Sequence, residues 1–114
     1  MPGVPAVSRD GWLERNGSPV AEVGNYTHNV GHMWHLAVSE SGPLPDLDAT
    51  DGMRGAEALP HLAAAVAWMI ANAEQLRPLE PENGWGDLRG AVAYLVGAAL
   101  ACSEHPDAVL RWDV

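Results

Sequence analysis

The sequence predicts an α+β domain, in which a small antiparallel sheet packs against about three helices that cover one of its faces. Three observations lead to this fold class. Two short strand-like runs flank an Asn-Gly pair near the N-terminus, three longer segments repeat apolar residues at helical spacing, and the last residues alternate between apolar and polar. The 114 residues suit a single domain, which we place at 10–114, after a loose leader at 1–9 that contains Pro2 and Pro5.

An N-terminal β-hairpin is indicated by the runs 11–15 and 19–23, which are separated by Asn16, Gly17 and Ser18. The Asn-Gly pair supplies the positive φ angles that a tight hairpin turn requires. Because an isolated hairpin is only marginally stable in water, these two strands must pack against the rest of the chain.

The first helix is predicted within 25–38. Asn25 or Thr27 is expected to cap it, because either side chain can accept a hydrogen bond from a free N–H of the first turn. Apolar residues recur at i, i+3, i+4, i+7 and i+8, so they share one face of this helix: Val30, Met33, Trp34, Ala37 and Val38.

Two further helices are predicted at about 56–74 and 86–104, because apolar residues repeat there at helical spacing. Pro60 fits the earlier of these helices only within its first turn, where a missing N–H does no harm. The later helix is expected to stop at His105 and Pro106. The final segment, 108–114, alternates and predicts a last strand with these residues on one face: Ala108, Leu110, Trp112 and Val114.

The charge of the chain excludes two classes of partner. Six arginines, no lysine and fifteen acidic residues give a formal net charge of −9. A sequence-independent binder of DNA or RNA needs a basic surface, and so does a protein that docks on an anionic membrane. No secretory signal is visible, and the longest apolar run, 91–102, is too short to span a bilayer. We therefore expect a cytoplasmic protein.

Neither a metal nor another cofactor is expected. His28, His32 and His35 are spaced so that a helix would place them on one face, where imidazoles can share a metal ion, but no acidic residue or thiol lies nearby in sequence. A solvated histidine face is the favoured interpretation. The acidic loop 46–52 resembles an EF-hand loop, but its turn glycine comes one place late. The single Cys102 allows no internal disulfide and is expected to be a buried, inert thiol.

Two segments combine hydrogen-bonding side chains with nearby aromatic residues, and they are the candidate binding site. One is 25–29, and the other is 83–87, at the start of the predicted helix 86–104. Amide and hydroxyl groups beside aromatic rings suit a pocket for a polar, partly aromatic ligand, although helix capping and core packing explain the same residues. The candidate ligand-binding residues are Asn25, Tyr26, Thr27, His28, Asn29, Met33, Trp34, Asn83, Trp85 and Arg89.

Asn25, Thr27 and Asn29 form an Asn-x-Thr-x-Asn motif, and 83–86 form an Asn-Gly-Trp-Gly turn. With these motifs the chain resembles a family of small, uncharacterised proteins of bacteriophages, prophages and actinobacteria. The resemblance covers about 19–114, and Leu88 departs from it where an aromatic residue is expected. It implies a phage-related accessory role, which includes binding directed against host defence, in the cytoplasm of the bacterial host. The resemblance rests on three features in order: the Asn-x-Thr-x-Asn motif before a Met-Trp helix, the Asn-Gly-Trp-Gly turn, and a terminal strand after a His-Pro stop. The residues concerned are Asn25, Thr27, Asn29, Met33, Trp34, 83–86, Cys102, His105 and Pro106.

Three functional hypotheses follow. The first is a non-enzymatic binding protein that sequesters a small polar or nucleotide-like ligand, with Arg54 and Arg89 as phosphate partners that a homo-oligomer would double. The second is an acidic inhibitor that imitates nucleic acid and blocks a basic groove on a host protein, although the acidic residues are spread along the chain. The third, an enzyme that uses His28 as a base or the histidines as metal ligands, lacks a nucleophile and an orienting carboxylate.

Overall fold

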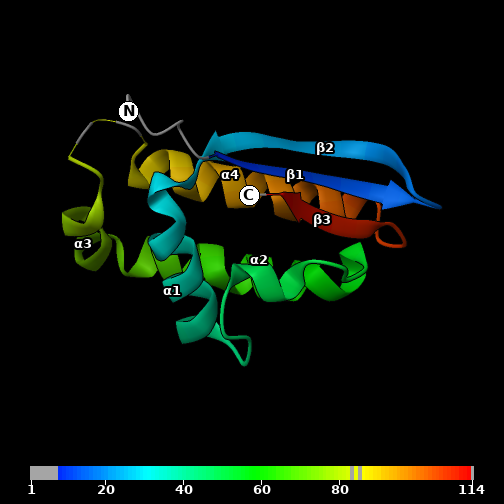
Figure 1. Cartoon of the computed structure of the whole chain (residues 1–114). Coiled ribbons are helices and arrows are strands. Elements are labelled where there is room, and N and C mark those ends of the chain that lie inside the picture. The colour runs from blue at the N-terminus through cyan, green and yellow to red at the C-terminus, as the bar shows by residue number, and fades with distance from the viewer. Residues whose placement is uncertain (1–7, 83, 85, 114) are drawn as a thin grey trace.

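The computed structural model describes residues 8–82, 84 and 86–113, except the side chain of His28, and confirms the α+β fold class. Its three-stranded antiparallel sheet has the order β2-β1-β3. In Figure 1 the helices lie on one side of this sheet, with α4 along its length and α2 beyond. The elements are β1 (Ser8–Arg15), β2 (Ser18–Thr27), the 3₁₀ turn η1 (His28–Val30), α1 (Gly31–Ser41), the 3₁₀ turn η2 (Leu47–Thr50), α2 (Gly55–Ala71), α3 (Ala73–Leu76), the 3₁₀ turn η3 (Arg77–Leu79), α4 (Leu88–Glu104) and β3 (Val109–Asp113).

The predicted hairpin is confirmed, and its strands are longer than expected. Asn16 and Gly17 adopt φ angles of 55° and 80°, as a tight turn between twisted strands requires. β1 begins at Ser8, so the assignment of Ser8 and Arg9 to a loose leader was wrong. Both residues pair with β2, Ser8 with Thr27 and Arg9 with Tyr26. Residues 1–7 of that leader lie outside the described part of the chain.

The start of the first helix was also placed wrongly. β2 continues to Thr27, which pairs with Ser8, so the backbone of 25–27 belongs to the sheet and Asn25 caps no helix. Thr27 does accept a hydrogen bond from a first-turn N–H, that of Asn29 at 3.3 Å, but at the start of the 3₁₀ turn η1. The helix α1 begins only at Gly31, after η1, and has no side-chain cap. The predicted apolar face is nevertheless buried, because its spacing is the same once the helix has begun: Val30, Met33, Trp34, Ala37 and Val38.

The predicted helix at 56–74 is divided at Asn72 into α2 and the short α3. Pro60 lies in the interior of α2 rather than in its first turn, and it is exposed to solvent. The predicted helix at 86–104 is confirmed as α4, which Asp87 caps by accepting a hydrogen bond from the Gly90 N–H at 2.7 Å. None of the described helices is long and apolar enough to cross a membrane.

The core lies between the sheet and the helices. β3 contributes Leu110 and Trp112 to it, as the alternation of the C-terminal segment predicts. The beginning of α2 lies against the end of α4, where a Cβ added to Gly55 would come within 2.8 Å of the Cys102 carbonyl oxygen. The two longest helices are therefore antiparallel neighbours, and both turn their buried residues toward the sheet and α1.

Candidate functional site

An arginine lies in the middle of the core. The Arg9 side chain is 0% exposed, and its Nη2 donates a hydrogen bond to Asp48 Oδ1 at 2.6 Å. Its Nε and Nη1 have no hydrogen-bond partner among the described residues. Burying a charged group with unsatisfied donors is costly, so the presence of this arginine needs a reason beyond packing.

Sequence reasoning missed Arg9 because it assigned the residue to the leader. The signal was present in the alternation of β1. Arg9, Gly11 and Leu13 are buried, whereas Asp10 and Trp12 point to the other face of the sheet. Side chains alternate between the two faces of a strand, so the buried face of β1 includes Arg9 as well as Gly11 and Leu13. The apolar residues of β1 alone do not reveal this.

Aromatic rings surround the guanidinium. Its carbon atom lies 5.1 Å from the ring centroid of Trp112 and 5.7 Å from that of Trp34, within the range of cation–π attraction. The Tyr94 ring lies 5.3 Å from Trp34 and 6.0 Å from Trp112, and the half-buried Tyr26 ring is 6.1 Å from Tyr94. These four residues, Tyr26, Trp34, Tyr94 and Trp112, are called the aromatic cluster below.

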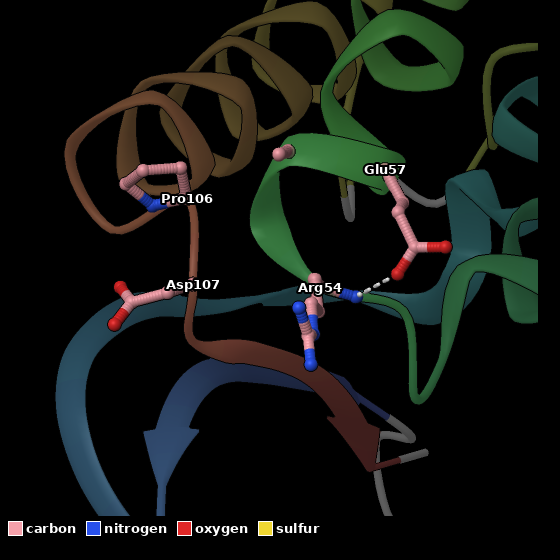
Figure 2. A pocket seen from close by; sticks show the side chains of 5 residues that line it. Arg54, Glu57, Pro106 and Asp107 are labelled. Carbon is pink, nitrogen blue, oxygen red and sulfur yellow. Dashed lines mark hydrogen bonds between the residues drawn. The ribbon is translucent and has the colours of Figure 1, made fainter.

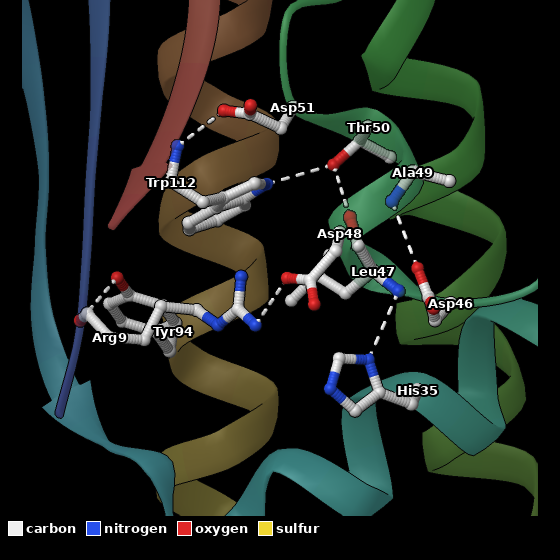
Figure 3. Close-up of polar contacts among 10 residues, drawn as sticks. All are labelled: Arg9, His35, Asp46, Leu47, Asp48, Ala49, Thr50, Asp51, Tyr94 and Trp112. Atoms are coloured by element: carbon white, nitrogen blue, oxygen red, sulfur yellow. Dashed lines mark hydrogen bonds and ion pairs between the residues drawn. The ribbon is translucent and has the colours of Figure 1, made fainter. Parts of the chain in front are cut away.

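Polar groups of the aromatic cluster are bonded to the backbone and to η2 (Figure 3). The Trp112 Nε1–H donates to Thr50 Oγ1 at 2.8 Å, and Thr50 in turn donates to the Leu47 carbonyl oxygen at 2.7 Å. The Tyr94 hydroxyl lies 3.0 Å from the Arg9 carbonyl oxygen and 2.9 Å from the Gly24 carbonyl oxygen, so its single O–H hydrogen is shared between two acceptors. Because burial raises the pKa of Tyr94, this hydroxyl keeps its proton at neutral and moderately alkaline pH.

Three of the predicted ligand-binding residues are now part of the core or pack against it. Met33 and Trp34 are fully buried, and Trp34 Nε1–H donates to the Ala91 carbonyl oxygen at 3.0 Å, so neither side chain meets a ligand in this conformation. The Tyr26 hydroxyl accepts a hydrogen bond from the Asp87 N–H at 3.2 Å. This contact brings the two predicted segments together, since Tyr26 belongs to 25–29 and Asp87 to 83–87.

The other predicted residues do not gather around one cavity. Asn25 lies on the opposite side of the sheet from Tyr26 and donates to Asp10 Oδ1 at 2.9 Å. Thr27 Oγ1 accepts from the N–H of the exposed Asn29 at 3.3 Å. Asn83, Trp85 and the side chain of His28 lie outside the described residues.

The two expected phosphate partners lie far apart. Arg54 precedes α2 beside the end of α4, whereas Arg89 lies in the first turn of α4, and a helix of 17 residues spans about 25 Å. Carboxylates of the chain itself already occupy the start of α4, where Glu80 Oε2 accepts from the Leu88 N–H at 2.8 Å. Arg89 lines a small depression of about 210 Å³ there, together with two acidic residues and one further arginine.

The depression around Arg54 is larger, at about 650 Å³, and it is shallow and of mixed charge (Figure 2). Glu57 Oε1 accepts from the Arg54 N–H at 3.2 Å at the start of α2. Asp107 is held by Arg15 at 2.8 Å, and the hydrogen bond from that guanidinium lowers the pKa of the Asp107 carboxyl. Two acidic residues beside one arginine favour neither an anionic nor a cationic ligand.

The described histidines of α1 have separate partners rather than a shared metal site. His32 Nε2 lies 2.8 Å from the Leu79 carbonyl oxygen, and His35 Nδ1 accepts from the Leu47 N–H at 3.2 Å. In the described part of the chain, one group of three side chains brings possible metal-binding atoms within 4.8 Å of one another: His35, Asp46 and Asp48. The Arg9 guanidinium bound to Asp48 would repel a cation there, so this group serves as a polar link between α1, η2 and β1.

Cys102 is the buried thiol that the sequence predicts. Its side chain is inaccessible, and burial raises its pKa to about 11. A thiol with this pKa is almost entirely protonated at neutral pH, and the thiolate is the nucleophilic form. The sulfur atom therefore supports no nucleophilic catalysis.

The sheet face turned away from the helices gathers acidic residues that are scattered in the sequence. Trp12 is half-buried at its centre, opposite Glu22 on β2 and Arg111 on β3. We call this surface, whose carboxylates outnumber its one arginine, the acidic sheet face; it is made of Asp10, Trp12, Glu14, Glu22, Arg111 and Asp113. No described element covers it (Figure 1). Comparison of the chain with protein-family models, with curated proteins and with solved structures finds no match, and the acidic sheet face is therefore interpreted from its own chemistry.

Proposed function

We propose that the chain is a non-enzymatic binding protein whose acidic sheet face docks on a basic surface of a partner protein. The observation that supports this proposal is the arrangement of four carboxylates around the half-buried Trp12 on one open face. Tryptophan is enriched in the energetic centres of protein interfaces, and surrounding charges guide the approach of an oppositely charged partner.

The acidic sheet face has an internal cost. Asp10 and Asp113 are direct partners in the pairing of β1 with β3, and like charges placed opposite each other destabilise a sheet. The Asn25 amide offsets part of the repulsion by donating to Asp10. Arg111 offers little more, because its Nε is paired with Asp51 at 3.3 Å. A cationic partner would relieve the repulsion between Asp10 and Asp113 on binding. Such a local destabilisation in the free protein is therefore expected at a binding surface.

The resemblance to phage and prophage proteins supports a more specific form of this proposal. In that form the partner is a bacterial host protein whose basic groove otherwise binds nucleic acid, and the chain acts as an inhibitor in the host cytoplasm. A net charge of −9 on a small domain is suited to such competition, because the rate of association with a basic groove rises with electrostatic attraction.

Binding of an arginine-rich decapeptide tests the acidic sheet face. Calorimetric titration at low salt should show that Glu22→Gln with Asp113→Asn weakens binding about tenfold, because two local charges are lost. The matched control, Glu40→Gln with Glu74→Gln, removes two exposed charges from α1 and α3 and should change the affinity less than about twofold. Equal weakening by both pairs would show that overall charge governs binding, and would contradict a role for the sheet.

We propose as a second candidate that the aromatic cluster and Arg9 bind a small nucleotide-like ligand. The supporting observation is the pair of unsatisfied N–H donors of Arg9 beside aromatic rings, which match a phosphate or carbonyl oxygen and a stacked base. Because Arg9 is fully buried, side chains packed around it have to move aside for such a ligand to enter.

A panel of cyclic and linear nucleotides, titrated calorimetrically, tests this candidate. We expect at least one to bind, and expect Arg9→Met to abolish that binding, because methionine fills similar space without donating hydrogen bonds. Absence of heat across the panel, or unchanged binding by the variant, would contradict the candidate.

A further inference from the structure

The outer sides of α2 and α4 are unusual for a surface exposed to water. Neither 58–73 nor 90–103 contains a single Asp, Glu, Lys or Arg residue, although the whole chain carries twenty-one. A surface helix ordinarily places charged and polar residues opposite its buried side. Here Ile70 is 63% exposed and Leu100 is 59% exposed.

The Leu100 side chain lines a groove between the two helices, and Ile70 lies one turn beyond this lining on α2. The groove has a volume of about 370 Å³ and an almost entirely apolar lining. On α2, the lining residues Leu59, Ala63 and Val66 have the spacing i, i+4 and i+7, and Ile70 follows at i+11. These four residues therefore form one continuous stripe along the helix. We call this surface the helix-pair groove. It is lined by Leu59, Ala63, Val66, Val96, Ala99, Leu100 and Ser103.

We infer that a second copy of this chain covers the helix-pair groove, so that the protein is a two-fold symmetric dimer. The charge of the chain limits where two copies can meet. Two copies that each carry −9 repel each other wherever their acidic surfaces meet, and the uncharged groove is where they approach at the least cost. A basic partner protein would instead be drawn to acidic surfaces such as the sheet.

The shape of the surface is compatible with self-association. A two-fold interface requires one patch that carries both the protruding and the receiving parts. Leu100 and Ile70 are exposed, whereas the small residues Ala63 and Ala99 line the hollow between the helices. Small residues at such positions allow helices of two copies to approach to about 8–10 Å between axes.

The expected contact area is sufficient for a specific dimer. Each helix has 17 residues and is about 25 Å long, and two helices side by side are about 20 Å wide. The footprint is therefore about 500 Å² on each copy, or about 1,000 Å² in total, which is near the lower limit for specific interfaces. We therefore expect a dimer that dissociates at micromolar concentrations.

Light scattering coupled to size exclusion tests this inference on the full chain. At an eluted concentration of about 10 μM the unmodified protein should have close to twice the monomer mass, whereas Leu100→Glu should be mostly monomeric. A carboxylate desolvated in the groove should raise the dissociation constant about 100-fold. Far-UV circular dichroism checks that the Leu100→Glu protein remains folded. We expect it to fold, because Leu100 is 59% exposed and contributes little to the core.

The matched control is Ser39→Glu, which adds the same charge to an exposed position of α1, away from the outer sides of α2 and α4, and should leave the dimer intact. A monomeric unmodified protein at 1 mM would overturn the inference. So would a Leu100→Glu protein that is still dimeric, because the contact would then lie on another face. Either result leaves the peptide titration of the acidic sheet face unaffected, so the two proposals fail separately.

Discussion

Replacing Gly90 by alanine is expected to lower the free energy of unfolding by about 2 kcal/mol, although alanine is ordinarily the better helix former. Gly90 lies in α4 beneath the Tyr26 ring. An added Cβ would lie 2.5 Å from Tyr26 Cζ and nearer still to the hydroxyl oxygen. The ring would have to move away from α4, which would break its hydrogen bond with the Asp87 N–H and disturb its packing on Tyr94.

Gly97→Ala provides the matched control within the same helix. A Cβ at Gly97 meets nothing within 4 Å, so this substitution should raise the free energy of unfolding by up to about 1 kcal/mol. Urea denaturation of both variants, followed by tryptophan fluorescence and far-UV circular dichroism, measures the two effects. Stabilisation by both substitutions would show that Tyr26 does not pack on α4.

Arg9→Met is expected to leave the protein as stable as the unmodified chain, or more stable by about 1 kcal/mol, whereas Arg9→Ala should destabilise it by about 3 kcal/mol. Methionine fills the space between Trp34 and Trp112 and removes a buried charge with two unsatisfied donors. Alanine leaves a cavity there. Because the Asp48 side chain is 56% exposed, it remains hydrated after Arg9 is lost.

Denaturant unfolding at pH 7 compares the three proteins. The difference between the methionine and alanine variants isolates the packing contribution, since both lack the charge. A loss of more than about 3 kcal/mol in Arg9→Met would show that the ion pair and the cation–π contacts hold the fold together. In that case the unsatisfied donors would no longer support the small-ligand candidate.

The elements that the sequence predicts correctly are those determined by local patterns. The Asn16-Gly17 turn requires positive φ angles, and the apolar stripes of α1, α2 and α4 need only helical spacing to be recognised. The beginning of α1 depends instead on pairing between distant residues, because Ser8 holds Thr27 in the ladder. The burial of Arg9 likewise depends on Asp48, thirty-nine positions away, and no local pattern reveals such a partner.

The candidate binding segment 25–29 was expected to present its side chains together, as the first turn of a helix would. In a strand, successive side chains point to opposite faces, so Asn25 faces solvent and Tyr26 faces the core. For the same reason, acidic residues that appear scattered along three separate segments meet on one face once the strands pair. Strand register, which the sequence alone does not define, therefore decides both results.

α4 connects the two proposed surfaces. On one side of α4 the Tyr94 hydroxyl is hydrogen-bonded to backbone carbonyl groups of β1 and β2. On the other side Val96 and Leu100 line the helix-pair groove. In a dimer formed through that groove, the two acidic sheet faces would point in opposite directions, separated by rigid helices. Such a molecule would be bivalent but could not grip one target twice, so it would gain no avidity on a single protein and would instead crosslink two.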